Sequence, residues 1–129
     1  MFRKVLFAAL LSWLIVPALA SAGELQPFDG KLFDQLQAQG KPVVVVVHAT
    51  WCPTCKAQKP IQSALMHSPE FRDYTMFTVD FDADQALLKR FSVIKQSTMI
   101  VFKGKSEVGR SIGDTQRDSI EALMLKAKS

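Results

Sequence analysis

Cysteine and histidine are scarce in this sequence. Its 129 residues include two cysteines, Cys52 and Cys55, and two histidines. The sequence has neither a second Cys-x-x-Cys pair nor a His-x-x-x-His pair, so it lacks the residues of a complete structural zinc site. It also lacks a distant cysteine for a bridge across a long loop. The cysteine pair therefore bonds to itself, to another molecule or to a metal ion.

Net charge is also small. The formal net charge is +4, and Arg3 and Lys4 lie in a segment that we expect to be removed, which leaves about +2. So small an excess gives no argument for binding to nucleic acid or to an anionic membrane. Internal repeats and low-complexity segments are absent too, and the length fits one domain.

The N-terminal segment has the three-part layout of a secretory signal peptide. A short positive start precedes an apolar run at 5–16, and small-x-small cleavage sites follow, after Ala20 and after Ala22. The apolar run is shorter than the roughly 20 residues of a membrane span. We therefore predict a signal peptide at 1–22 and a periplasmic domain at 23–129 without stable membrane insertion. The alternative is an uncleaved N-terminal anchor.

Apolar patterning after this segment predicts alternating helices and strands. Five consecutive valines at 43–47 indicate a central strand, because β-branched residues favour strands and an unbroken run implies burial on both faces. The pattern also predicts helices at 31–39, at 82–91 and after a cap at Asp114 or Thr115, strands at 75–81, 98–102 and 107–111, and a lead-in loop at 24–30.

A further helix is predicted to begin at the cysteine pair, with Pro60 kinking it. Its expected apolar face consists of Ala57, Ile61, Ala64 and Leu65. The last two strands are joined by a tight turn at 104–105. This order of elements predicts an α/β fold, a three-layer α/β/α sandwich whose mixed sheet has a parallel core and an antiparallel edge hairpin.

The position of the cysteine pair indicates its chemistry. Cys52 lies between the carboxyl end of a buried strand, where open α/β sheets bind their ligands, and the start of a helix. Unpaired N–H groups and the helix dipole favour a thiolate there, and the thiolate is the nucleophile of disulfide exchange. The spacing places Cys55 one turn further inward. We therefore predict thiol–disulfide exchange, with Cys52 attacking and Cys55 resolving the mixed disulfide.

Alternatives remain for the pair and its neighbours. The cysteines could also bind a soft ion such as Cu(I) or Zn(II), or form an inert local disulfide. Alternatively, the protein is a module that binds a partner chain without turnover. Trp51 is expected to shield the sulfurs and contact substrate, or simply to pack. His48 acts near the site or is a satisfied, partly buried histidine. Lys56 favours the thiolate or is a solvated lysine.

The segment 49–56, Ala-Thr-Trp-Cys-Pro-Thr-Cys-Lys, with Pro60 downstream, resembles the active-site segment of the thioredoxin superfamily. Residues 98–104 resemble that family's later strand and hairpin turn, and the order of elements matches from about Leu25 onward. The resemblance implies a thioredoxin-like fold, exchange with protein substrates and a redox partner protein, and no cofactor; we expect a monomer. The residues expected to shape the substrate site are Trp51, Pro53, Thr54, Ser97 and Thr98.

Two positions depart from the pattern of that family. The family normally has a cis-proline before the threonine of the later strand, where this chain has Ser97 before Thr98. A cis bond costs other residues roughly 2.5–4 kcal/mol, so the Gln96–Ser97 bond is either trans or cis and strained. The family also often buries an aspartate beneath the second cysteine, where this chain has Val46. We therefore expect proton loss from Cys55 to be slower or to rely on water.

Overall fold

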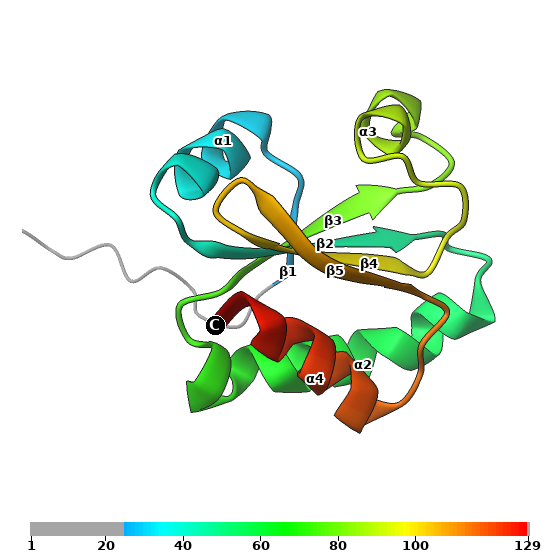
Figure 1. Ribbon diagram of the computed structural model, residues 1–129. Coiled ribbons are helices and arrows are strands. Elements are labelled where there is room, and N and C mark those ends of the chain that lie inside the picture. Colours follow the sequence, from blue (N-terminus) through cyan, green and yellow to red (C-terminus); the bar gives the residue numbers. More distant parts are fainter. Residues whose placement is uncertain (1–24, 129) are drawn as a thin grey trace, which may run out of the picture.

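The middle layer of the protein is a five-stranded mixed sheet (Figure 1). The computed structural model describes residues 25–128. The strands lie in the order β1-β3-β2-β4-β5, with β1 to β3 parallel and β4 antiparallel to both β2 and β5. Their bounds are β1 Leu25–Pro27, β2 Pro42–His48, β3 Thr75–Asp80, β4 Thr98–Lys103 and β5 Ser106–Ile112.

Helices cover both faces of the sheet. In Figure 1, α1 and α3 lie on one face, and α2 and α4 lie on the other. Their bounds are α1 Gly30–Ala38, α2 Pro53–His67, α3 Gln85–Arg90 and α4 Arg117–Leu125, with short 3₁₀ turns at Pro69–Phe71 and Lys126–Lys128. The predicted three-layer sandwich with a parallel core and an antiparallel edge hairpin is confirmed.

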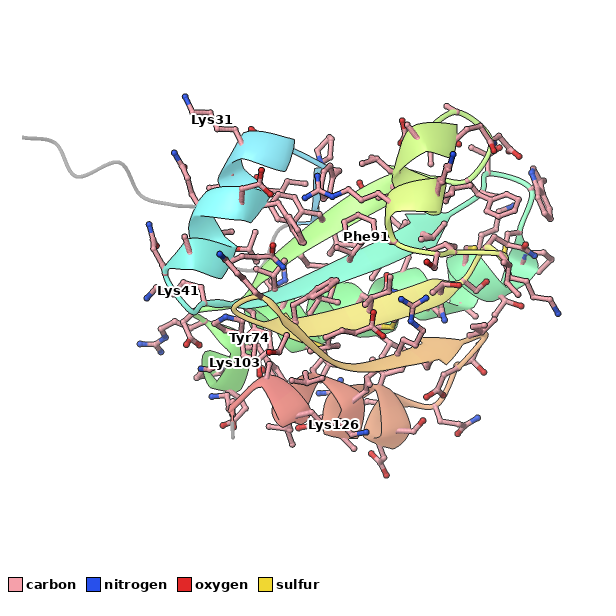
Figure 2. All side chains as sticks on the ribbon, turned by 45° about the horizontal axis from the view of Figure 1, so that its top comes forward. Lys31, Lys41, Tyr74, Phe91, Lys103 and Lys126 are labelled. Carbon is pink, nitrogen blue, oxygen red and sulfur yellow. The ribbon has the colours of Figure 1, made fainter. Side chains whose placement is uncertain are left out.

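The valine run of β2 is buried on both faces, as its composition predicts. Val43, Val45 and Val47 pack into an aromatic-rich core under α1 and α3, where Figure 2 shows Phe91. Val44 and Val46 pack on the opposite side, in the core shared with α2 and α4. Burying a side chain of this size contributes about 1.5 kcal/mol or more, so this strand anchors both cores.

Two expectations about local structure are wrong. Leu25–Pro27, predicted as loop, forms the short edge strand β1, which pairs with β3; three residues are too few to show a period of two. The helix α4 has Gln116 at its N-cap position rather than Asp114 or Thr115. Asp114 instead accepts the N–H of Gln116 at 2.9 Å.

The buried face of α2 also differs from the prediction. Its buried residues are Cys55, Gln58, Gln62, Leu65 and Met66, whereas Ala57 and Ala64 are exposed. Because Gln58 and Gln62 are buried, the face of α2 that packs on the sheet consists of other residues than the predicted apolar ones. The helix is not interrupted at Pro60.

No helix within residues 25–128 is both long and apolar enough to cross a membrane. The predicted signal peptide at 1–22 lies outside the described residues.

Candidate active site

The connection from β2 to α2 lies at one end of the sheet (Figure 1). Cys52 is the N-cap residue of α2, and Cys55 lies in its first turn. Cys52 has extended backbone geometry at the N-cap of α2, and its sulfur accepts the N–H of Cys55 at 3.1 Å. Pro53 occupies the first helical position, where its missing N–H costs nothing. The sulfur thus stands where a helix usually has a capping oxygen, and the N-terminal dipole favours its thiolate form.

Ser97 is brought to both sulfurs by the pairing of β4 with β2. Its hydroxyl oxygen lies 3.1 Å from the Cys52 sulfur and 3.2 Å from the Cys55 sulfur. The contact spans more than 40 residues of chain. The residue before the threonine of β4 therefore contacts the reacting atoms directly.

The backbone at Ser97 is held in an unusual conformation. All peptide bonds of the described chain are trans, which decides between the alternatives for the Gln96–Ser97 bond, and Ser97 has a φ of 64°. Such left-handed geometry costs a non-glycine residue about 1–3 kcal/mol. Three hydrogen bonds offset this cost: Ser97 donates its N–H to Val47 O at 2.9 Å, and its carbonyl accepts from Gly113 N at 3.0 Å and from Gln58 Nε2 at 3.2 Å.

Solvent exposure does not distinguish the two cysteines. Cys52 is 1% exposed and Cys55 is 3% exposed. Ser97, also buried, lies against both sulfurs. Both cysteines are free thiols in this structure.

Electrostatics distinguishes them instead. Burial raises the pKa of Cys52, but hydrogen bonds from the Cys55 thiol, the Ser97 hydroxyl and the N–H groups of Cys55 and Thr54 outweigh it and bring the pKa below that of an ordinary thiol. The pKa of Cys55 is raised, first by burial and then by its hydrogen bond to Cys52. The first thiolate to form is therefore at Cys52.

The expected site-shaping residues surround the cysteines in different ways. Trp51 is 56% exposed, and its Nε1 donates to Asp82 Oδ2 at 2.8 Å, so the indole is held at the surface rather than packed. Pro53 is exposed and Thr54 is half-buried. Thr98 is buried and donates to Lys95 O at 2.7 Å, which fixes the turn before β4.

Lys56 and His48 also have defined places. Lys56 is exposed at the start of α2. His48 is half-buried at the end of β2, and its Nε2 is buried without a hydrogen-bond partner in the described chain. Among residues 25–128, no protein group therefore serves as the partner that we expected for this nitrogen.

Sequence reasoning missed three neighbours of the site. Gln58 is fully buried and donates to the carbonyls of Ser97 and Asp114, so it ties α2 to two loops. Asp82 holds Trp51, and Phe81 packs against the cysteines. The sequence gives no sign that a glutamine or an aspartate has these partners, because the partners come from distant segments.

Among residues 25–128, no group of three or more His, Cys, Asp or Glu side chains is placed to hold a metal ion.

Two buried thiols whose pKa values are displaced in opposite directions, at the end of a central strand of this sandwich, define a dithiol redox site. The family model for thioredoxin matches residues 25–126. The chain belongs to the thioredoxin family and is a thiol–disulfide oxidoreductase with Cys52 and Cys55 at the Cys-x-x-Cys spacing. Members of this family act on protein disulfides.

Individual relatives support the same assignment. Thioredoxin from Chlamydia trachomatis serovar D is 34% identical over 65% of this chain and 80% of its own length. The crystal structure of Trxlp from Edwardsiella tarda EIB202 is 40% identical, with a TM-score of 0.75 over 78% of this chain and 98% of that one. A bifunctional thioredoxin reductase/thioredoxin from Mycobacterium leprae is 32% identical over 66% of this chain, and the match spans 18% of its length.

Proposed function

We propose that this protein exchanges disulfides with exported protein substrates, with Cys52 as the attacking thiol and Cys55 as the resolving thiol. The observation that carries the assignment is the place of the Cys52 sulfur at the N-cap of α2, 3.1 Å from Cys55 N and 3.1 Å from Ser97 Oγ, where its pKa is lowered while that of Cys55 is raised. A lowered pKa increases the thiolate fraction near neutral pH, and the thiolate is the form that attacks.

The exchange has two steps. The Cys52 thiolate attacks one sulfur of the substrate disulfide, forms a mixed disulfide and releases the other substrate sulfur as a thiolate. Cys55 then loses its proton and attacks the Cys52 sulfur, which releases the second substrate thiolate. The substrate gains two electrons and the protein is left with a Cys52–Cys55 disulfide. A redox partner protein with a dithiol restores the starting state.

Exposed apolar side chains mark the surface that a substrate chain would contact. Trp51, Ile94 and Ile112 are 56%, 79% and 50% exposed. Each lies on a segment of the site: Trp51 precedes Cys52, Ile94 lies in the loop before Ser97, and Ile112 pairs with Thr98. A peptide that covers these side chains gains hydrophobic contact next to the buried sulfurs.

Reduction of insulin disulfides, with dithiothreitol as electron source, tests the cysteine roles. We expect Cys52→Ser to abolish the activity, and Cys55→Ser to accumulate a mixed disulfide that mass spectrometry detects at Cys52. A mixed disulfide at Cys55 in the Cys52→Ser protein, with none at Cys52 in the other variant, would reverse the roles.

We also propose that residues 1–22 direct export and that the mature protein is periplasmic and monomeric. Support comes from the positive start, the short apolar run at 5–16 and the cleavage sites after Ala20 and Ala22. N-terminal sequencing of protein from the native host should give Ser21 or Gly23 as the first residue. An intact Met1 in the membrane fraction would contradict export with cleavage. Light scattering of the mature protein gives its oligomeric state.

A further inference from the structure

The resolving step of the proposed exchange leaves one proton without an acceptor. Cys55 is 3% exposed, and burial together with its hydrogen bond to Cys52 raises its pKa. Its thiol must still lose a proton before it attacks. Val46, which stands where the family often has an aspartate, is buried in an apolar core.

The strand β2 places His48 on the same side of the sheet as Val46. Side chains alternate along a strand, and Val44 and Val46 face the core shared with α2. His48, two residues after Val46, therefore also faces the side covered by α2, which carries Cys55. The Cys55 sulfur lies 3.9 Å from the carbonyl oxygen of Val47, the residue next to His48.

His48 and Cys55 line one pocket. It has a volume of about 560 Å³ and lies between α2, the ends of β2 and β3, and β1. The charged groups that line it are Lys56 and Lys59 from α2 and Asp80 from β3, while β1 contributes only Leu25 and Pro27. A water needs only tens of cubic ångströms and two to four polar partners, so this pocket has room for a bridging water between the imidazole and the thiol.

Of the ionisable side chains that line this pocket beside Cys55, Asp80 and His48 have atoms that accept a hydrogen bond, whereas the lysines only donate. Asp80 is exposed, and its Oδ1 accepts the N–H groups of Asp82 and Ala83 at 2.8 and 3.0 Å. His48 has a buried Nε2 with no partner in the described chain. Burial, and then the charge of Lys59, lower the pKa of His48, so its imidazole is neutral at pH 7 and has a free lone pair.

We infer that His48 is the proton acceptor of the resolving step. This inference rests on the proposed exchange reaction. The proton passes from the Cys55 thiol through a water in the pocket to the imidazole. The Cys55 thiolate attacks the Cys52 sulfur, the sulfur–sulfur bond to the substrate breaks, and the substrate sulfur leaves with the electron pair. His48 then returns the proton to solvent.

A two-phase reaction with 5,5′-dithiobis(2-nitrobenzoate) separates the steps. Attack by Cys52 releases one coloured thiolate, and attack by Cys55 on the resulting mixed disulfide releases the second. General bases contribute 10²- to 10⁴-fold, so we expect His48→Asn to slow the second phase at least ten-fold at pH 7 and to leave the first within two-fold. The pH profile of the second phase should lose the inflection of the histidine.

The other histidine supplies a matched control. His67 is exposed at the end of α2, where its Nδ1 lies 2.7 Å from Ser63 O, and we expect His67→Asn to leave both phases unchanged. Added imidazole should restore the second phase of His48→Asn, which a purely structural defect would not allow. Lys59→Met should move the inflection to higher pH, because it removes a charge that opposes protonation of His48.

Each contrary result has a distinct meaning. An unchanged second phase in His48→Asn, an equal slowing of both phases, or a second phase lost in Asp80→Asn instead would overturn the role of His48. Failure of the wild-type protein to release a second thiolate would contradict the proposed exchange reaction itself.

Discussion

The hydroxyl oxygen of Ser97 lies within 3.2 Å of the sulfurs of both Cys52 and Cys55, at 3.1 Å from the former. A hydroxyl has one proton to donate, and it donates most strongly to the sulfur that carries charge. Since the pKa of Cys52 is lowered and that of Cys55 is raised, we expect the Cys52 thiolate to accept the proton of the Ser97 hydroxyl in the reduced protein.

Removal of this hydroxyl should therefore raise the pKa of Cys52. A hydrogen bond to a charged group contributes about 1.5–3 kcal/mol, so Ser97→Ala should raise this pKa by about one to two units. The reduced form loses stability, and the redox potential of the pair should fall by about 30 mV per 1.4 kcal/mol. Thiolate absorbance at 240 nm and equilibration with glutathione measure the two effects. Ser97→Gly, which also lacks the hydroxyl but suits the positive φ, is the control for backbone strain and should show the same two shifts. Equal values in Ser97→Ala and wild type would exclude the donation.

A proline at the same position should disrupt the site. Proline requires a φ near −65° and has no N–H, whereas Ser97 has a φ of 64° and donates to Val47 O. We expect Ser97→Pro to lower the free energy of unfolding by at least about 2 kcal/mol, from the lost hydrogen bond and the forced change of backbone. Ser97→Gly, which suits the positive φ, should retain wild-type stability or exceed it in urea unfolding. A Ser97→Pro protein as stable as Ser97→Gly would contradict this conformation.

The alkylation rates of the two thiols should differ in their dependence on pH, and not because one thiol is more exposed to solvent than the other. Both are nearly fully buried, so the rate with iodoacetamide should follow the thiolate fraction. We expect the Cys55→Ser protein, which retains Cys52, to react at lower pH than the Cys52→Ser protein, which retains Cys55. A Cys55→Ala profile should lie above that of Cys52 in the wild type, because no side chain at position 55 then donates to the thiolate. Coincident profiles would show that the site does not distinguish the sulfurs.

Deprotonation of Tyr74 should lower the free energy of unfolding at high pH. Burial, followed by the charges of Asp73 and Glu70, raises its pKa to about 12, and its hydroxyl donates to Met124 O at 2.7 Å. A raised pKa means that the folded state holds the proton more tightly, so this contribution is complete below pH 10 and is lost as pH rises toward 12. A shift of this size amounts to about 3 kcal/mol.

The Tyr74→Phe protein isolates this effect from other groups that titrate in the same range. Urea unfolding at pH 8 and pH 11 should show a larger loss of stability in the wild type than in Tyr74→Phe. An identical pH dependence in the two proteins would mean that Tyr74 ionises as freely in the folded chain as in the unfolded one.

Local pattern was enough to predict the layers of this protein. The valines at 43–47 indicated a strand buried on both faces, and periodic apolar residues placed most helices and strands within a few residues. The edge strand β1 was missed because Leu25–Pro27 owes its extended form to β3 rather than to its own composition. The buried face of α2 was predicted at the wrong residues because Gln58 and Gln62 are polar and yet buried.

The sequence by itself determined the dithiol chemistry, since the Cys-x-x-Cys pair, the strand before it and the helix after it are contiguous. Tertiary structure alone decided what surrounds the sulfurs. The positive φ and trans peptide bond of Ser97 depend on partners at Val47, Gln58 and Gly113, each more than ten residues away. The common pocket of His48 and Cys55 depends on how α2 packs beside β1 and β3. Local sequence does not encode such contacts, because their energy arises only when distant segments pack together.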